Sequence, residues 1–227
     1  MNEGEVSPDE GVGDYPSGES RFLPTLAVLA LIGLPFLVPE SLRNGVHVIL
    51  AGLAAALMIA ILLADPGRID RRGHLIRGLS ITLTVVLVGA AMVAAGTLVV
   101  DLLAGAPSFN SPIHLLTTGA LVWLDTNITF SLFYWELDGG GPAERMHRAT
   151  RHPDLAFVQH INPDLAPPGW RPTFGDYLYL GHTNALAFSP TDVMPMTAWA
   201  KAAMAVQSVI SVLILSLVVA NAVNLLS

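Results

Sequence analysis

Four stretches of the chain contain no Asp, Glu, Lys or Arg, and this feature constrains the fold more than any other. They cover residues 22–39, 44–64, 79–100 and 202–227, and the stretch 102–135 has Asp125 as its only charged residue. An α-helix needs about 20 apolar residues to cross ~30 Å of hydrocarbon. Charged residues make up 13% of the chain, against about 25% in soluble domains. The sequence therefore predicts an all-α integral membrane protein.

We expect about five transmembrane helices and one shorter helix before the last of them. The predicted spans cover residues 22–39, 46–64, 79–103, 113–135 and 197–226. The segment 173–188 is also apolar, but it is shorter than a span and contains Asp176, His182 and Asn184. A re-entrant half-helix or a helix lying in the membrane interface suits that length.

The chain divides into three predicted parts. Residues 1–20 carry acidic but no basic side chains and are rich in Gly, Ser and Pro, which is typical of a disordered segment. Because a signal peptide begins with basic residues, we expect the first span to be retained. Residues 21–105 form a three-helix segment, and residues 106–227 form a span, a re-entrant loop and a final span. Within this last part, the prolines before Thr173 make regular structure unexpected there, apart from a short helix over 143–150.

The eleven Lys and Arg residues predict the topology. Most of them lie between spans two and three or between spans four and five, so these two loops lie on the same side of the membrane. With five spans, Arg21 and Lys201 join that side and only Arg43 faces the other one. Because cytoplasmic loops carry an excess of Lys and Arg, we expect a cytoplasmic N-terminus and an external C-terminus.

One face of the fourth span is polar, with Asp125 near its centre. At 100° per residue, Thr118, Asp125 and Thr129 point the same way, and His114 and Glu136 continue this face toward the two ends. A carboxylate at the bilayer centre costs about 2.5–3.5 kcal/mol on insertion scales. Asp125 therefore either belongs to an ion pathway or proton relay, or is a neutral group that joins helices through a hydrogen bond.

The last span carries a second set of polar side chains on one side. Gln207, Ser211 and Asn221 lie within about 80° of one another on a helix. They are candidates for lining the same ion pathway. The alternative is that they join helices by hydrogen bonds, which is the ordinary role of such residues in spans.

The order span, half-helix, polar turn and final span resembles the pore domain of the potassium-channel superfamily. Against that family's T-T-x-T-T-V-G-Y-G-D-x-x-P pattern, Thr183, Asp192 and Pro195 coincide. The resemblance implies a pore loop and a homo-oligomer, most simply a tetramer, whose constriction is the turn after the half-helix. That turn holds Thr183, Ser189, Pro190, Thr191 and Asp192.

The filter glycines of that family are missing here. Ser189, Pro190 and Thr191 stand where the family has Gly, Tyr and Gly. Because potassium filters coordinate the ion with stacked backbone carbonyls, the usual potassium selectivity is not carried over. The basic loops also place 136–196 in the cytoplasm, whereas a potassium-channel pore loop starts outside; the inverted pore of ionotropic glutamate receptors has the orientation expected here.

Several phrases of the second half are similar to a group of uncharacterised bacterial polytopic membrane proteins. The phrases occupy 133–142, 176–179, 187–192 and 199–201. The resemblance implies a bacterial inner (plasma) membrane and brings no activity with it.

The sequence favours an ion channel, for cations or protons, or a channel-like membrane protein. The alternatives are a non-conducting scaffold or regulatory protein acting through its cytoplasmic loop, and a secondary transporter. A dry monomer would favour the scaffold, and a monomer with a midplane cavity at Asp125 would favour transport. We expect no enzyme, since no Walker, Rossmann or GxSxG motif is present. We also expect no cofactor, no metal and no nucleic acid as a partner.

Overall fold

The computed structural model describes most of the chain. The described residues are 18–38, 45–66, 68–69, 73–147, 153–187 and 192–226. The long helices are α1 (Phe22–Leu37), α2 (Gly45–Ala64), α3 (His74–Leu103), α4 (Pro112–Leu137) and α8 (Ala198–Leu226). The shorter helices are α5 (Pro142–His147), α6 (Val158–Ile161) and α7 (Phe174–Ala187). The strands form two antiparallel pairs, β1 (Glu19–Ser20) with β2 (Arg68–Ile69) and β3 (Leu155–Phe157) with β4 (Val193–Pro195).

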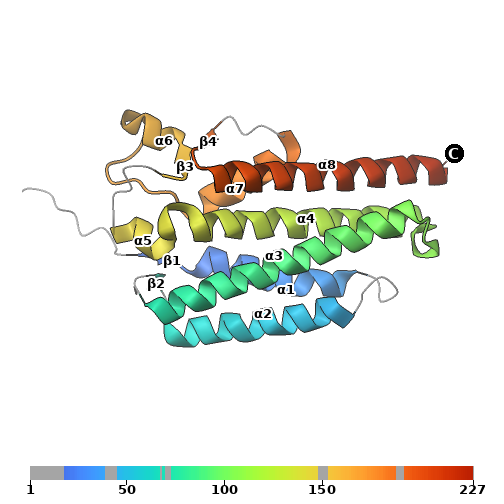
Figure 1. Ribbon diagram of the computed structural model, residues 1–227, viewed down its shortest axis with the longest axis horizontal. Coiled ribbons are helices and arrows are strands. Elements are labelled where there is room, and N and C mark those ends of the chain that lie inside the picture. Colours follow the sequence, from blue (N-terminus) through green and yellow to red (C-terminus); the bar gives the residue numbers. More distant parts are fainter. Residues whose placement is uncertain are drawn as a thin grey trace, which may run out of the picture.

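Helix α4 is the centre of the molecule. It packs against α1 and α3 on one side and against α7 and α8 on the other, while α2 lies outside α1 and α3. Figure 1 shows the long helices side by side, running back and forth along one axis. The fold is therefore an all-α bundle, as the apolar runs predict.

Among the residues that the structure describes, three helices are long and apolar enough to cross a membrane. They are α2, α3 and α8. Helix α1 is apolar but only 16 residues long. Helix α4 has 26 residues, which is sufficient length, but its polar face makes it less apolar than the others. Membrane insertion thus rests on α2, α3 and α8, with α4 enclosed between neighbours.

The ends of α4 are fixed by turn residues. Pro112 occupies the first helical position after Ser111. Proline is favoured there because the N–H that it lacks would have no partner within the helix. At the other end, Gly139, Gly140 and Gly141 all have positive φ angles. A side chain at Gly141 would collide with the Arg77 guanidinium. The glycine run therefore turns the chain sharply and lets α3 approach it closely.

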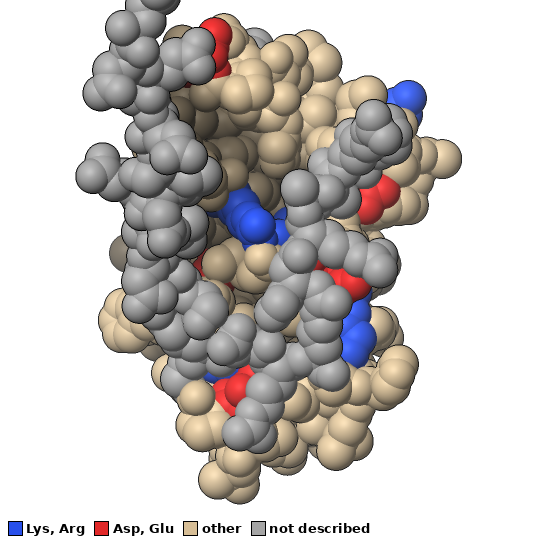
Figure 2. Space-filling view, turned by 90° about the vertical axis from the view of Figure 1, so that its left-hand side faces the viewer, with Lys and Arg blue, Asp and Glu red and all other residues tan. Residues whose placement is uncertain are grey.

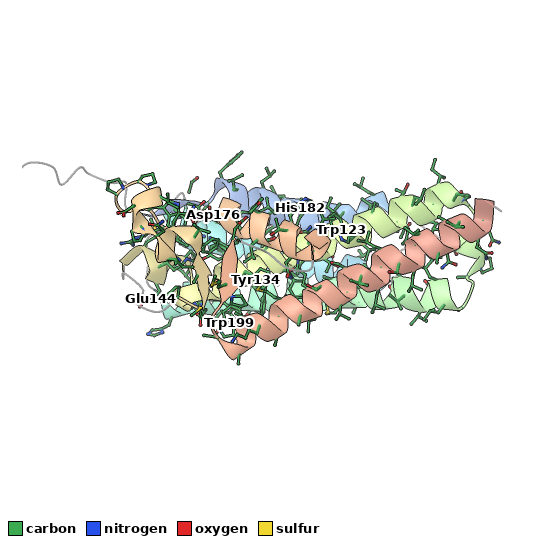
Figure 3. All side chains as sticks on the ribbon, turned by 90° about the horizontal axis from the view of Figure 1, so that it is seen from above. Trp123, Tyr134, Glu144, Asp176, His182 and Trp199 are labelled. Atoms are coloured by element: carbon green, nitrogen blue, oxygen red, sulfur yellow. The ribbon has the colours of Figure 1, made fainter. Side chains whose placement is uncertain are left out.

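Helix α7 runs antiparallel to the second half of α4. The ring of Phe174, the first residue of α7, lies 5.8 Å from the ring of Trp135. Further along α7, the ring of His182 lies 5.9 Å from that of Trp123, and Figure 3 shows this pair. The sequence places this helix over 173–188, within a residue of each observed end.

The chain then returns to the end where α7 began. Strand β4 follows within six residues of Ala187 and pairs with β3. The ring of Phe157 in β3 lies 5.2 Å from that of Tyr177, in the first turns of α7. Helix α7 and the segment after it thus start and finish at the same end of the bundle.

Two segments differ from the sequence expectations. Glu19 and Ser20, placed by composition in a disordered tail, form β1; residues 1–17 lie outside the described part. The proline-rich stretch before Thr173 contains β3 and α6, although regular structure was not expected there. Both segments are ordered by contacts with distant parts of the chain, which local composition does not report. The expected helix over 143–150 corresponds to α5, and residues 148–152 lie outside the described part.

The basic residues gather at one end of the bundle. Arg21 precedes α1, Arg77 lies in the first turns of α3, Arg145 lies in α5, and Lys201 lies in the first turn of α8. All these segments meet at the end seen in Figure 2, where blue and red side chains lie close together. The charge asymmetry inferred from the sequence is thus an asymmetry of the folded bundle.

Candidate functional site

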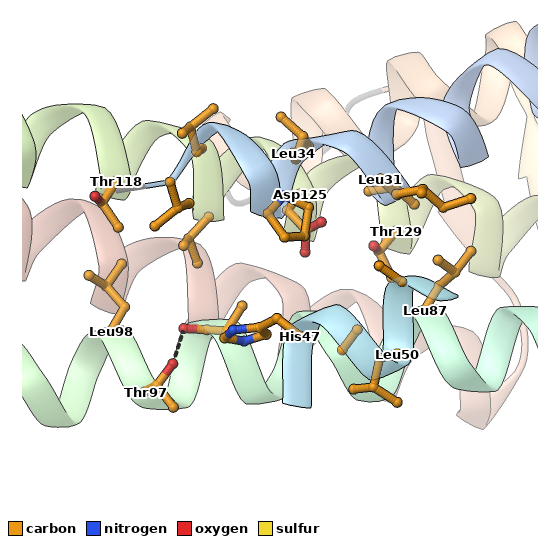
Figure 4. A pocket seen from close by; sticks show the side chains of 18 of the residues that line it. Leu31, Leu34, His47, Leu50, Leu87, Thr97, Leu98, Thr118, Asp125 and Thr129 are labelled. Carbon is orange, nitrogen blue, oxygen red and sulfur yellow. Dashed lines mark hydrogen bonds between the residues drawn. The ribbon is translucent and has the colours of Figure 1, made fainter. Parts of the chain in front are cut away.

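Asp125 points into a cavity lined mainly by α1, α2, α3 and α4, here called the Asp125 cavity (Figure 4). The cavity has a volume of about 70 Å³. Its walls are mostly apolar, and its polar lining residues are His47, Thr97, Asp101, Thr118, Asp125 and Thr129. The three residues that the sequence placed on one face of the fourth span, Thr118, Asp125 and Thr129, therefore line one cavity.

Two of the polar side chains that line this cavity, Asp125 and Thr118, have no protein partner among the described residues. Within the described part of the chain, no hydrogen bond or ion pair joins the Asp125 carboxylate to another residue. The hydroxyl of Thr118, a residue that is 4% exposed, also has no partner there. Buried polar groups are nearly always hydrogen-bonded, to water if not to protein. About 10–15 Å³ suffices for one water molecule, so this cavity has room for several.

The face of α4 that carries Asp125 continues along further cavities. Thr129, Leu132 and Glu136 follow Asp125 at steps of four, three and four residues, which keeps them on one face. Leu132 and Glu136 line a second, smaller space between α1, α2, α3 and α4, here called the middle cavity, of about 60 Å³. Asp125 and Glu136 are three turns apart, or ~16 Å along the helix.

A third and larger cavity opens at the basic end, here called the basic-end cavity. Its volume is about 360 Å³, and it is lined by residues of α3 and α5 and by Arg21, Trp135 and Glu136. Arg21, Ser80, Trp135 and Glu136 line both this cavity and the middle one. The two cavities therefore adjoin at Glu136.

Two ion pairs surround that junction. The Arg77 guanidinium donates to the carboxylate of Glu136 and, at 2.9 Å, to its backbone carbonyl. Arg21 donates to Asp65 at 2.5 Å, with both side chains largely buried. Buried charges in proteins are normally paired in this way. Glu136 thus has a cationic partner, whereas Asp125 has none among the described residues.

An apolar zone lies between the Asp125 cavity and the middle cavity. Leu87 lines both of them, and Leu83 and Leu132 line the middle cavity beside it. All three leucines are less than 10% exposed. The Asp125 cavity and the middle cavity therefore meet at apolar side chains around Leu87.

The polar residues of the last span lie elsewhere. Gln207 is fully buried, accepts from Tyr134 and from Asn184 at 2.7 Å each, and donates to the carbonyl of Gly181 at 2.8 Å. This network joins α4, α7 and α8 on the side of α4 away from the Asp125 cavity. Ser211 is also buried, and Asn221 donates to Leu217 of its own helix at 2.9 Å. The structure therefore does not bring Gln207, Ser211 and Asn221 together with Asp125.

The predicted pore-loop turn is described only at its two sides. The Thr183 hydroxyl donates to the backbone of its own helix, at Tyr179 and Leu180. Asp192 accepts from the Tyr179 hydroxyl at 3.1 Å. Ser189, Pro190 and Thr191 lie outside the described residues.

A buried cluster of hydrogen-bonded side chains, centred on Asp138, lies at the basic end. The Asp138 carboxylate accepts from the Tyr177 hydroxyl at 2.5 Å and from the backbone N–H groups of Asp154 and Leu155 at 3.1 Å each. Arg145 donates to the carbonyls of Trp135 and Asp138 and lies over the Tyr177 ring. Burial raises the pKa of Asp138, and its hydrogen bonds and Arg145 offset this only in part.

Several residues around the cavities were not identified from the sequence as a site. His47 and Asp101 stand near the ends of apolar runs, where polar residues are ordinary, and Arg21, Asp65 and Arg77 contribute to loop charge. The sequence shows that Asp125 and Glu136 are eleven residues apart on one helix face. The cavities that lie between them depend on how α1 and α3 pack against α4, which the sequence does not show. Within the described part, no three potential metal ligands gather.

No model of a known protein family matches the chain, and neither a curated protein nor a solved structure matches it.

Proposed function

We propose that this is a membrane protein that conducts protons through the α1–α4 bundle of a single chain, with Asp125 and Glu136 as the proton-carrying groups. The observation that carries the proposal is the series of three cavities along one face of α4, adjoining at Leu87 and then at Arg21 and Glu136. A proton would enter with water at the Asp125 cavity, bind the Asp125 carboxylate, and pass by water to Glu136. Carboxylates within spans are the usual groups of such relays.

The proposal includes the topology and the count of spans. Helices α1 and α4 join α2, α3 and α8 as the fourth and fifth spans, and α7 is the re-entrant half-helix. The basic end faces the cytoplasm of a bacterial inner membrane, because Lys and Arg are retained on that side. The Asp125 cavity then faces outward, and the basic-end cavity faces the cytoplasm.

A path within one chain is favoured over a pore between copies. In the tetrameric alternative, Gln207 and Ser211 would line a central axis shared by four chains. Both side chains are instead buried between α8 and its neighbours, where their hydrogen bonds and packing are used within the chain. The cavity at Asp125 is lined by helices of one chain, which supports this choice.

The proposal is tested by ion flux into liposomes that contain the purified protein. A potassium diffusion potential drives the uptake of protons and of sodium, and potassium uptake is followed in separate liposomes under a potassium gradient alone. We expect proton uptake by the wild type and at least a tenfold loss in Asp125→Asn. The matched control is Asp164→Asn, which removes an exposed carboxylate that lines none of the three cavities; it should retain wild-type flux.

Two results would contradict the proposal. Equal proton uptake by wild type and Asp125→Asn would remove Asp125 from the path. If the correctly inserted protein takes up none of the three ions, the non-conducting scaffold is favoured instead.

A further inference from the structure

Arg21 lies directly before α1 and faces two cavities. It lines the middle cavity and the basic-end cavity, as Glu136 does. Its guanidinium is held by Asp65, which is 3% exposed and lines neither cavity. A positive charge is thus fixed at the junction, and its counter-charge lies behind it.

Arg77 adds a second fixed positive charge on the other side of Glu136. It lines the basic-end cavity and donates to both the carboxylate and the carbonyl of Glu136. Gly141 lies so close to the guanidinium that a Cβ there would collide with it. Arg77 is therefore confined between α4 and the glycine turn.

We propose that Arg21 and Arg77 determine the specificity of the path, by excluding metal cations while protons pass. This inference rests on the proposed function. A sodium or potassium ion leaving the middle cavity must approach first the Arg21 guanidinium, which is largely buried, and then that of Arg77. Repulsion between like charges is stronger at the buried group, where less water screens it. Fixed arginines form electrostatic barriers of this kind in selective pores. A proton instead binds the Glu136 carboxylate and crosses the junction without existing as a separate cation.

The test removes the charge of Arg21 together with its partner. The double variant Arg21→Gln with Asp65→Asn removes both charges of this buried pair together, so it is expected to fold. We expect its sodium and potassium uptake in liposomes to rise at least tenfold above the wild-type value. Arg21→Lys keeps the positive charge, and Asp65→Asn keeps the guanidinium; both should still exclude sodium and potassium.

A second double variant reports on the other arginine. Arg77→Gln with Glu136→Gln removes the second barrier charge and the proton-carrying carboxylate together. We expect it to lose proton uptake while it gains sodium and potassium uptake. Monodisperse elution and an unchanged helical spectrum show that each variant is folded.

The outcomes separate the two proposals. Asp125-dependent proton uptake with no gain of cation uptake in either double variant overturns the specificity role and leaves the proton path standing. Equal cation leakage by Asp65→Asn and the Arg21 double variant also overturns it, because the leak would then come from lost packing. Cation uptake by the double variants, without proton uptake by the wild type, supports the arginine barrier and overturns proton conduction. If neither the wild type nor any variant takes up protons, sodium or potassium, both the proton path and the specificity role of the arginines are overturned.

Discussion

The hydroxyl of Tyr134 donates a 2.7 Å hydrogen bond to Oε1 of Gln207, on the side of α4 opposite to Asp125. Nine residues separate Tyr134 from Asp125, which is half a turn beyond two full turns. The same helix thus holds its neighbours with one face and lines the cavities with the other.

Removal of this hydroxyl should affect stability and leave conduction unchanged. In Tyr134→Phe, Gln207 keeps its bonds to Asn184 and Gly181, so we expect a loss of about 0.5–1.5 kcal/mol in the free energy of unfolding. Thermal unfolding in detergent measures the loss, and liposome flux serves as the control. Altered proton selectivity in this variant would connect the α8 network to the path after all.

The close approach of α7 to α4 depends on Gly181. A methyl group there would collide with the Ser131 hydroxyl and lie 3.2 Å from the carbonyl oxygen of Asn127. We expect Gly181→Ala to destabilise the protein by about 1–3 kcal/mol through overpacking. Addition of Ser131→Ala should restore part of this loss. Gly33→Ala, at a site with open space around it, is the control and should be tolerated.

The apolar zone between the cavities should limit the rate. Leu87→Ala removes the side chain that lines both the Asp125 cavity and the middle cavity, so we expect proton flux to rise severalfold. Leu98→Ala, in the same helix and equally buried, borders only the Asp125 cavity among these three and is the matched control. A decrease of flux in Leu87→Ala alone would show that this side chain is not the barrier.

The buried Asp138 makes stability depend on pH. Burial raises its pKa above the ordinary value of 3.8, so the folded protein binds its proton more strongly than the unfolded chain does. This contribution to stability is present at low pH and is lost as the pH rises through the raised pKa. We expect wild type to lose stability relative to Asp138→Asn as the pH increases above about 4. Parallel unfolding curves of the two proteins over this range would contradict the assignment.

The absence of cysteine from the sequence allows a direct test of topology. Asn110→Cys places a thiol at an exposed site between α3 and α4, and Asp164→Cys places one at the basic end. With a membrane-impermeant maleimide on intact bacterial cells, we expect labelling at position 110 and none at 164 until the cells are permeabilised. The reverse pattern would place the basic end outside.

The helical architecture can be predicted from the sequence, but only part of the candidate site can. Charge-free runs and the turn residues around them predict every long helix, because insertion into lipid depends on local composition. The polar face of α4 was visible as a 3.6-residue repeat, and Thr118, Asp125 and Thr129 do share a cavity. The role of Gln207 depends on which helix lies beside α8, and periodicity on one helix holds no information about its neighbour. The ion pairs of Arg21 and Arg77 join residues 44 and 59 positions apart, beyond the reach of any local pattern.

Glu19 links the start of the described chain to a helix formed much later in the sequence. Its carboxylate accepts from the Trp135 ring at 2.9 Å and from the first backbone N–H of α7, at Phe174, at 2.5 Å. During synthesis, the residues before α1 leave the ribosome long before Phe174 does. Glu19 therefore cannot take its final position until α7 has been made and docked. The order of biosynthesis thus makes closure of the basic end one of the last steps of assembly, after α1–α4 have been synthesised.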